Sequence, residues 1–546
     1  MNKKRTLLTG LVTVCILVAA MLICPPYYSM NDDVMMKSIL SGAYTGTPDG
    51  HAIYMKYPLT GILSLLYRIL PVVPWFELFM TMCFIVAIAA VVVRVQGMLA
   101  QKDGKLTGFA WGLGAGAISL VFTLFVPQIF TLHYTLVAAM MGSCGLFLLL
   151  TGGGVVSIVL LLLTYCIRSQ VFFLLLPFLL VSVLWNIIDK NIRPMCRQVL
   201  ILGLGIVICM AWNGIMYRST EWKQYEVYNE SRTKLYDYDK LLPYEGNEAD
   251  FEKLGISEIQ HRLMDEYVLV LADDITPEMM NAAAQLTASR KEAGQSFTEY
   301  LIYCVKEYYY HLRYNDGPYN YLLIAGYVGV FVLLICRKKW WKTALLGCML
   351  GGRSLIWIYL IWQGRFPERV YVSLYFLDLM ILTGMLLQLL KECKRKRFFT
   401  GACIAVSVAL LGVGISQCVM MTKRVEVHSD KHEEWRALKE YCEDNPEYTF
   451  LVDVYSTVDY SGKVWEQPVR ENYVLAGGWM SNSPLLKDKV SSLKAEECCY
   501  VISADRDVDW LHEYCKQRLN GVQIEKTDSI SQNGRVLFDI YRMAEK

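Results

Sequence analysis

Two adjacent carboxylates, Asp32 and Asp33, come shortly after a wholly apolar run at residues 6–24. A carboxylate in such a place can act as a general base and take the proton of an attacking hydroxyl group. A second interpretation is structural. The following residues, VMMKSILSG, have the pattern of a short amphipathic helix, and acids at a helix start cap it and favour its dipole. The residues alone leave both interpretations open.

Other short polar segments contain residue types that bind phosphates and sugars. They are His51, Lys56 and Tyr57 in 25–74, His133 in PQIFTLHY, Arg168 in YCIRSQ, and Arg365, Glu368 and Arg369 in WQGRFPERVY. Arginine holds a phosphate through two hydrogen bonds and stabilises charge that develops on it. The alternatives are that His133 is structural, that Arg168 extends to the membrane interface, and that GRFPER is a basic turn at headgroup level.

The elements that must position these residues are membrane helices. The chain has 546 residues, of which 54% are hydrophobic and 19% are charged. The apolar residues are grouped in runs of about 18–22, the length that a helix needs to cross a bilayer. We therefore predict an α-helical polytopic membrane protein with about eleven spans: 6–24, 75–95, 108–127, 132–151, 154–170, 171–188, 199–217, 318–336, 343–362, 369–390 and 400–420.

Residues 57–70 are apolar but too few to span a bilayer comfortably, so we predict an interfacial or re-entrant helix there. With this assignment, lysine and arginine concentrate in the short loops on the N-terminal side. These loops hold Lys3, Lys4 and Arg5; Arg94, Lys102 and Lys105; Lys190, Arg193 and Arg197; 337–342; and KECKRKR (391–397). The positive-inside rule then predicts a cytoplasmic N-terminus and an extracytoplasmic C-terminus in a plasma membrane.

Two longer polar regions fall on the outer side. One is an insertion at 218–317 within the transmembrane domain 1–420, whose first external loop is 25–74. The other is the region 421–546, where helical and strand patterns alternate at 433–444, 448–457, 498–507, 510–519 and 535–543. This alternation predicts a small extracytoplasmic α/β domain.

Arg353 and Asp378 both lie in the middle of predicted spans. These spans are consecutive and antiparallel, and each residue is about ten positions from the outer end of its helix, so both can lie at one depth. We predict a structural ion pair between them.

The acids after the first span, NDD (31–33), resemble the first external loop of the GT-C class of integral-membrane glycosyltransferases. MKYPLTGILSLLYRILP (55–71) and GRFPERV (364–370) are similar to bacterial polytopic proteins related to glucosyltransferases that modify surface polysaccharides. The resemblance covers roughly residues 1–400, and the chain has no WWDYG-type motif of oligosaccharyltransferases.

The resemblance implies transfer of a hexosyl group, with inversion, from a polyprenyl-phosphate donor to a glycan, lipid or protein acceptor of the cell envelope. Asp32 or Asp33 would be the base, and the other would orient the acceptor or a metal. Arg365, Arg369, Arg168 and Lys56 are the candidates for the donor phosphate. Tyr57, His51, His133 and Glu368 are the candidates for the substrate. The acids are compatible with Mg²⁺ or Mn²⁺ but do not require a cofactor, and we expect no nucleic-acid partner.

Three other functions fit a chain of this kind. A flippase for a lipid-linked saccharide predicts charged residues along a path through the membrane. A polysaccharide polymerase or ligase predicts catalytic arginines and a histidine in a large loop late in the chain. A non-enzymatic scaffold would depend wholly on residues 421–546.

Overall fold

The computed structural model describes residues 3–100, 107–294, 296–315, 318–391, 396–460, 462–467, 469–491, 497–518 and 522–545. Within these residues, nine helices are long and apolar enough to cross a membrane. They are α4 (Trp75–Leu99), α5 (Gly108–Phe125, continued by the 3₁₀ turn η1, Val126–Ile129), α6 (Tyr134–Thr151), α8 (Ser169–Ile188), α9 (Ile192–Met216), α15 (Tyr319–Cys336), α16 (Trp340–Trp362), α17 (Glu368–Lys391) and α18 (Lys396–Asp444). The helical membrane protein that the sequence predicts is thus what the structure describes.

The other two predicted spans are also helical, but their apolar parts are shorter. They are α1 (Lys3–Ile23), with an apolar part at Leu7–Ile23, and α7 (Val155–Ile167). A helix the length of α7 rises only about 20 Å, whereas the apolar core of a bilayer is about 30 Å thick. Among the described residues, nine helices thus meet the length and composition of a span, and the predicted count of eleven stays a prediction.

Helices α6 and α17 form the centre of the bundle. All residues of α6 are buried, and small side chains let its neighbours approach closely. A Cβ atom on Gly142 would lie 2.7 Å from Cδ1 of Leu175 on α8. Helices at the periphery, such as α9 and α18, instead expose apolar side chains, as expected of helices that face lipid.

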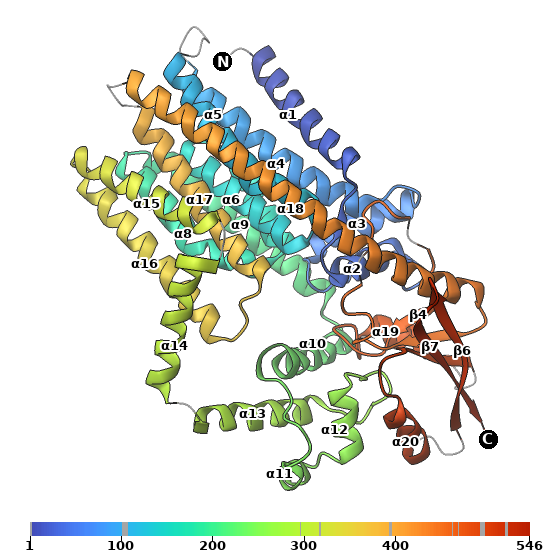
Figure 1. Ribbon diagram of the computed structural model, residues 1–546. Helices are drawn as coiled ribbons and strands as arrows, with labels where there is room; N and C mark the ends of the chain where they lie inside the picture. The colour runs from blue at the N-terminus through green and yellow to red at the C-terminus, as the bar shows by residue number, and fades with distance from the viewer. Residues whose placement is uncertain are drawn as a thin grey trace.

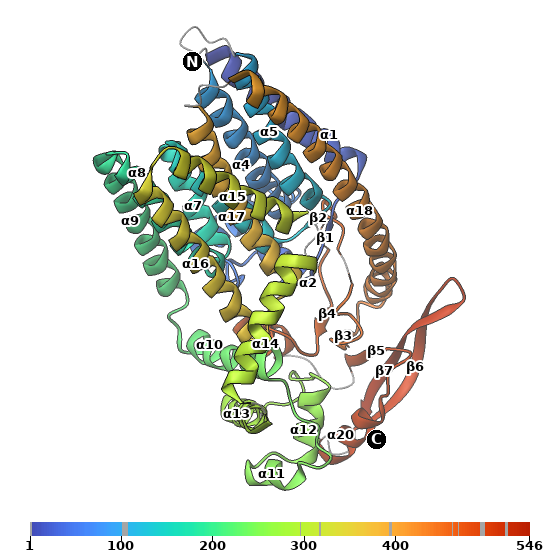
Figure 2. The same cartoon turned by 60° about the vertical axis from the view of Figure 1, so that its left-hand side comes forward.

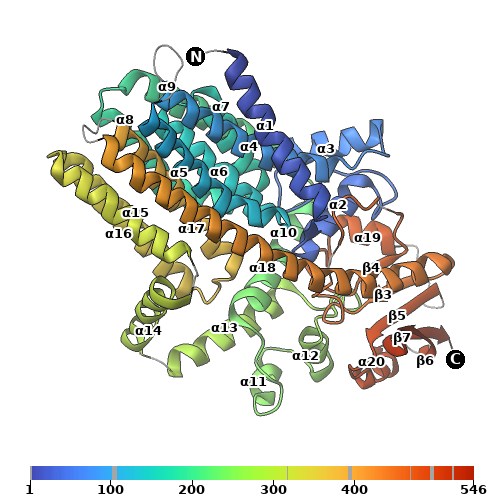
Figure 3. The ribbon, with the colours of Figure 1, turned by 45° about the horizontal axis from the view of Figure 1, so that its top comes forward.

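Helix α18 differs from the prediction. We predict a span that ends near 420 and a separate helix at 433–444, but the structure has one helix of 49 residues. The intervening residues MTKRVEVHSDKH (421–432) contain neither glycine nor proline, so nothing in them interrupts a helix. As a result α18 runs from the bundle to the strands of the C-terminal region (Figures 1 and 3).

The first loop forms two helices of different character. In α3 (Tyr57–Ile69) one face packs inward, with Leu59, Leu63 and Tyr67 buried, while Ile62 and Leu65 are exposed. This amphipathic pattern favours the predicted interfacial position. Helix α2 (Asn31–Ser41) is instead almost wholly buried, because the C-terminal region covers it.

The insertion is helical. It comprises α10 (Thr220–Thr233), the π-helical turn η2 (Lys234–Asp239), α11 (Glu248–Lys253), α12 (Glu258–Asp265), α13 (Pro277–Gly294), α14 (Phe297–Tyr310) and the π-helical turn η3 (His311–Asn315). The insertion and the C-terminal strands lie at the same end of the bundle, opposite to the N-terminus (Figures 1 and 2). The basic segments 101–106 and 392–395, part of the argument for orientation, lie outside the described residues.

The C-terminal region contains a five-stranded sheet in the order β4-β3-β5-β7-β6. Its strands β3 (Thr449–Val452), β4 (Tyr473–Leu475) and β5 (Cys498–Ser503) are parallel, and β6 (Val522–Gln532) and β7 (Arg535–Glu545) add an antiparallel hairpin. Helices α19 (Pro484–Val490) and α20 (Asp509–Arg518) complete the region. The five segments with predicted helical or strand patterns each contain such an element, and β4, β6 and α19 are additional.

Short backbone pairings bring distant loops together. Strand β1 (Tyr27–Tyr28) pairs in parallel with β2 (Thr131–Leu132), so that the first loop lies beside the loop between α5 and α6. The backbone N–H of Tyr28 also donates to the carbonyl of Gly462, 2.9 Å away. Three segments far apart in the sequence thus meet just before Asp32.

The predicted ion pair in the membrane is confirmed. Arg353 Nε lies 2.7 Å from Asp378 Oδ2, and both side chains are buried. Tyr327 donates to the second oxygen of Asp378, and the guanidinium group lies over the ring of Trp357.

Candidate active site

Asp33 is in the first turn of α2 and is completely buried. Its Oδ1 accepts a hydrogen bond from the backbone N–H of Tyr134, 2.9 Å away, at the start of α6. Its Oδ2 has no hydrogen-bond partner among the described residues. A buried carboxylate oxygen without a partner is costly, so it needs an explanation.

Asp32 is only partly buried and is held by a residue of the C-terminal region. The indole Nε1 of Trp479 donates to its Oδ1 over 2.9 Å. Trp479 reaches this position because the chain before it packs tightly against the insertion. A Cβ atom on Gly477 would lie 1.8 Å from the carbonyl oxygen of Tyr267, so only glycine fits there.

Two arginines lie near the acids. Arg168 separates α7 from α8 and lies over the rings of Tyr54 and Tyr134, 4.9 Å and 5.1 Å from their centres. Its Nη1 is buried and has no partner among the described residues. Arg369 is in the first turn of α17, where its Nη1 contacts Sδ of Met30 at 3.9 Å.

These four residues, Asp32, Asp33, Arg168 and Arg369, are termed the acid–arginine centre. No described acid lies within the 4.0 Å ion-pair distance of either arginine. The charges of the arginines nevertheless affect the pKa values of the two acids. Burial raises the pKa of Asp32, and the charges of Arg168 and Arg369 and the Trp479 hydrogen bond partly offset this rise. Burial raises the pKa of Asp33 well above its usual value, despite the backbone hydrogen bond from Tyr134.

The insertion adds a third arginine. Arg232 on α10 is buried, and its Nη1 donates to the hydroxyl of Tyr267 over 2.6 Å. Its charge also lowers the pKa of Asp32. The prediction from sequence missed Arg232, Tyr54 and Trp479; the glycine pair before Trp479 is the only local signal, and it does not indicate a partner.

The predicted residue His133 precedes α6 and adjoins this centre. Its Nδ1 accepts from the backbone N–H of Thr135, and its Nε2 is buried without a partner among the described residues. His133 and Arg369 line a cavity of about 320 Å³, termed the α18 cavity. Its other lining residues are Ser29, Met30, Gln128, Thr131, Leu136, Pro367, Glu368, Val372, Arg424 and His428.

Two other predicted residues of the 362–371 loop have partners elsewhere. Arg365 forms an ion pair with Asp237 of η2 at 2.8 Å and lies over the ring of Tyr238. Glu368 is paired with Arg424 on α18 at 3.1 Å. Of the arginines in this loop, Arg369 is therefore the one that faces the acids.

The remaining predicted residues lie on the first loop. Lys56 caps α3, and burial and the nearby Arg168 lower its pKa. His51 Nδ1 is within hydrogen-bond distance of Asp49 Oδ1, at 2.7 Å. The imidazole ring of His51 stacks on Trp222 of α10, and the ring of Tyr57 lies edge-on to the imidazole. These contacts join the first loop to the insertion.

A buried ion pair fixes α2 itself. Lys37, one turn after Asp33, lies 2.5 Å from Glu77 of α4, and both side chains are nearly inaccessible. Tyr67 of α3 donates to the same carboxylate. The helix that carries the acids is thereby held against the bundle.

Metal binding by protein ligands alone has little basis in the described residues. They contain no group of three or more His, Cys, Asp or Glu side chains that could hold an ion. Asp32 and Asp33 supply two carboxylates, so an ion there would need further ligands from a substrate or water.

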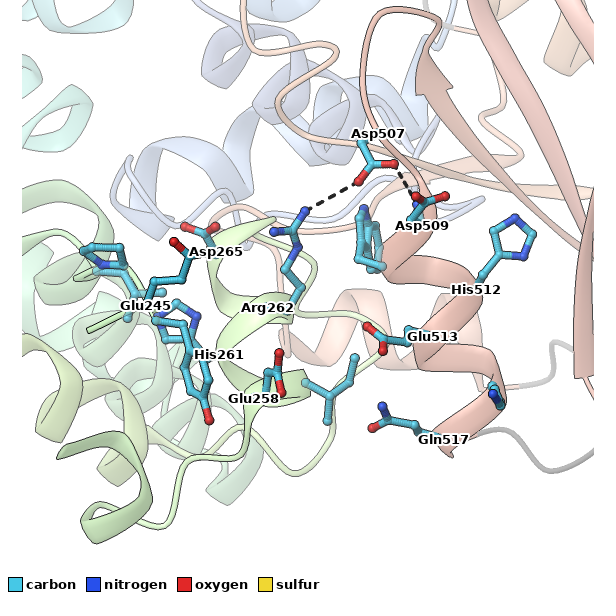
Figure 4. Close-up of a pocket in the computed structure, with 16 residues that line it drawn as sticks. Glu245, Glu258, His261, Arg262, Asp265, Asp507, Asp509, His512, Glu513 and Gln517 are labelled. Carbon is cyan, nitrogen blue, oxygen red and sulfur yellow. Dashed lines mark hydrogen bonds and ion pairs between the residues drawn. The ribbon is translucent and has the colours of Figure 1, made fainter. Parts of the chain in front are cut away.

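Another cavity, of about 970 Å³, lies between α12 and α20 (Figure 4). Acidic side chains line it from both regions, among them Glu258 and Asp265 of the insertion and Asp507 and Glu513 of the C-terminal region. It contains none of the predicted site residues. Arg262 of the insertion forms an ion pair with Asp507 of the C-terminal region across this cavity, with Nη2 3.8 Å from Oδ2.

Comparison with known proteins gives no relative. No protein-family model matches the chain, and no curated protein and no solved structure matches it.

Proposed function

We propose that the protein is a membrane glycosyltransferase of the GT-C type, which transfers a sugar from a polyprenyl-phosphate donor to an acceptor hydroxyl outside the cytoplasm. The observation that carries this proposal is the acid–arginine centre. Two carboxylates and two arginines lie near one another without forming ion pairs, at the end of the bundle where the polar regions gather. Charges that a protein holds close but unpaired leave room for a ligand between them.

Asp32 is the better candidate for the base. Its Oδ1 is fixed by Trp479, and its Oδ2 makes no hydrogen bond with a described residue and belongs to a partly exposed side chain. Burial raises its pKa toward neutrality, which suits a group that must accept a proton. Asp33, fully buried and with a pKa raised well above its usual value, is a positioning residue that orients the first turn of α2.

The proposed reaction is a single displacement. The acceptor oxygen attacks the anomeric carbon, and the bond from that carbon to the phosphate oxygen breaks with its electron pair. Asp32 takes the proton of the acceptor hydroxyl, and the lipid phosphate leaves. Attack opposite to the leaving group inverts the anomeric configuration.

The arginines stabilise the leaving group in this scheme. Arg168 and Arg369 approach the acids from α8 and α17 and offer guanidinium N–H groups that no described acid occupies. Such preorganised charge acts most strongly where water is excluded. The rings of Tyr54 and Trp479, 4.9 Å apart, supply an apolar surface against which a sugar ring can stack.

The test uses purified full-length protein in detergent with a panel of radiolabelled polyprenyl-phosphate sugars, with and without EDTA. We expect transfer or hydrolysis by the wild type, and loss of both in the Asp32→Asn/Asp33→Asn double variant while that variant still unfolds cooperatively above the assay temperature. Equal turnover in the folded double variant would contradict the proposal. Donor binding without turnover by the wild type would favour a flippase instead.

A further inference from the structure

The α18 cavity contains a buried hydrogen-bond donor without an acceptor. Because Nδ1 of His133 accepts from the backbone N–H of Thr135, the proton of the neutral ring must be on Nε2. That Nε2 is buried and has no partner among the described residues, and His133 is 2% exposed. A buried N–H group without an acceptor costs free energy, so a ligand that supplies the acceptor is favoured there.

The other polar groups of the cavity favour a negatively charged acceptor. Arg369 and Arg424 line it, and His428 on α18 adds a buried Nδ1 without a partner among the described residues. The acid in the lining is Glu368, which pairs with Arg424 at 3.1 Å. The first turn of α17 also lines the cavity, and the N-terminus of a helix of this length attracts anions.

Helix α18 indicates where such an anion comes from. Between Ile404 and Met420 this helix exposes a series of large apolar side chains, as a surface that faces lipid does: Ile404, Val406, Val408, Leu411, Ile415, Val419 and Met420. Arg424 and His428 follow within the next two turns, so the cavity begins where the apolar surface ends. An amphiphile can therefore lay its tail along α18 and its headgroup in the cavity.

We propose that the α18 cavity binds the phosphate of a membrane lipid, with His133, Arg369, Arg424 and His428 as its donors. The cavity adjoins the acid–arginine centre through Arg369 and through His133, whose neighbour Tyr134 binds Asp33. The inference thus builds on the proposed function and names the site for the donor phosphate. It adds Arg424 and His428, which are not among the candidate site residues that the sequence predicts.

The test measures binding alone, so it is independent of sugar transfer. Full-length protein in detergent receives radiolabelled polyprenyl monophosphate. Unlabelled polyprenol, which has the same tail without the phosphate, and inorganic phosphate are the competitors. We expect saturable binding of the lipid phosphate, with competition at least tenfold weaker from either competitor. Equal competition by polyprenol would overturn the phosphate assignment, and equal competition by inorganic phosphate would overturn the lipid assignment.

Variants locate the site. Arg424→Gln/His428→Gln should weaken binding at least tenfold, whereas Lys423→Gln, which removes the same charge from an exposed position of α18, should leave it unchanged. Glu368→Gln should strengthen binding, because it frees Arg424 and removes the acid from the lining. Wild-type affinity in the Arg424/His428 variant, or no gain in Glu368→Gln, would overturn the inference. If these variants behave as expected while no sugar is transferred, the lipid-phosphate site stands and the proposed function fails.

Discussion

Two groups of buried charges in this protein are built differently. In the membrane, Arg353 and Asp378 lie 2.7 Å apart, and Tyr327 and Tyr308 add hydrogen bonds to the carboxylate and the guanidinium. At the end of the bundle where the insertion and the C-terminal region lie, the charges of Arg168 and Arg369 act to lower the pKa of both Asp32 and Asp33, without forming ion pairs with them. Both groups contain a buried N–H or oxygen without a partner among the described residues, Arg353 Nη2 in the first and Asp33 Oδ2 and Arg168 Nη1 in the second. The first group has a direct ion pair between its acid and its arginine, and the second has none among the described residues.

The difference separates a structural role from a functional one. A buried charge is tolerated when it is paired and hydrogen-bonded, and leaving one unpaired costs several kcal/mol. The acid–arginine centre holds two carboxyl and two guanidinium groups close together without ion pairs and accepts this cost. A charged substrate that fits between them would remove it. The comparison predicts opposite consequences for substitutions in the two groups.

A large loss of turnover is expected for the arginines of the acid–arginine centre. Arg369→Gln and Arg168→Gln should each lower turnover about 10²–10³-fold, the usual effect of removing one preorganised donor. Arg365→Gln is the matched control, because Arg365 is in the same loop but is paired with Asp237. Initial rates with the labelled donor measure the effect, and equal losses in Arg365→Gln and Arg369→Gln would refute the assignment.

The free energy of unfolding should change most when the membrane ion pair of Arg353 and Asp378 is altered. Asp378→Asn leaves Arg353 buried without its counter-charge and should destabilise the protein by about 3–5 kcal/mol. The Arg353→Met/Asp378→Leu double variant should recover much of this loss, since two apolar side chains replace the pair. Thermal unfolding in detergent compares them, and a double variant no more stable than Asp378→Asn would argue against a purely structural pair.

Trp479→Phe tests the hydrogen bond to Asp32. The ring remains, but the N–H group that stabilises the carboxylate is lost, so the pKa of Asp32 rises further. Asp32 acts as a base only when it is deprotonated. Because its pKa is higher in the variant, acidification should abolish activity at a higher pH in the variant than in the wild type. A hydrogen bond to a charged group is worth about 1.5–3 kcal/mol, which corresponds to a shift of the acid limb by roughly one to two pH units. An unchanged pH–rate profile would show that Asp32 is not the group that titrates.

The smallest effect is a pH-dependent change in stability. The folded-state pKa of Asp33 is raised above its unfolded value. The contribution of Asp33 to the free energy of unfolding is therefore complete at low pH and is lost as pH rises through the folded-state pKa. The Asp33→Asn variant has no group that titrates at this position, so its melting temperature relative to wild type should increase with pH.

Asp49 is the control, because its pKa is shifted in the opposite direction. Burial, which raises its pKa, is outweighed by the His51 contact, so the net pKa is lowered and Asp49→Asn should lose stability at neutral pH.

The sequence was sufficient for much of the fold because hydrophobic runs and their lengths determine membrane helices directly. It also predicted the Arg353–Asp378 pair, since both residues belong to consecutive antiparallel helices. It did not predict that α18 continues past residue 420, because the end of an apolar run marks where a helix leaves the membrane and not where the helix ends.

The site was predictable only in part. Asp32, Asp33, Arg168, Arg369 and His133 belong to short loops that one end of the bundle must bring together. Trp479, Arg232 and Arg424 come from regions whose packing on those loops depends on tertiary contacts, such as the close approach of Gly477 to Tyr267. No local pattern encodes such contacts.

One measurement tests the central claim that the unpaired charges act on substrate and the paired charges do not. It is the turnover of a labelled polyprenyl-phosphate sugar, per folded molecule, by Asp32→Asn and by Arg353→Met/Asp378→Leu. We predict that Asp32→Asn lowers turnover about 10²–10⁴-fold, the usual contribution of a general base, while the double variant retains wild-type turnover. Full activity in Asp32→Asn, or loss of activity in a well-folded double variant, would contradict the account.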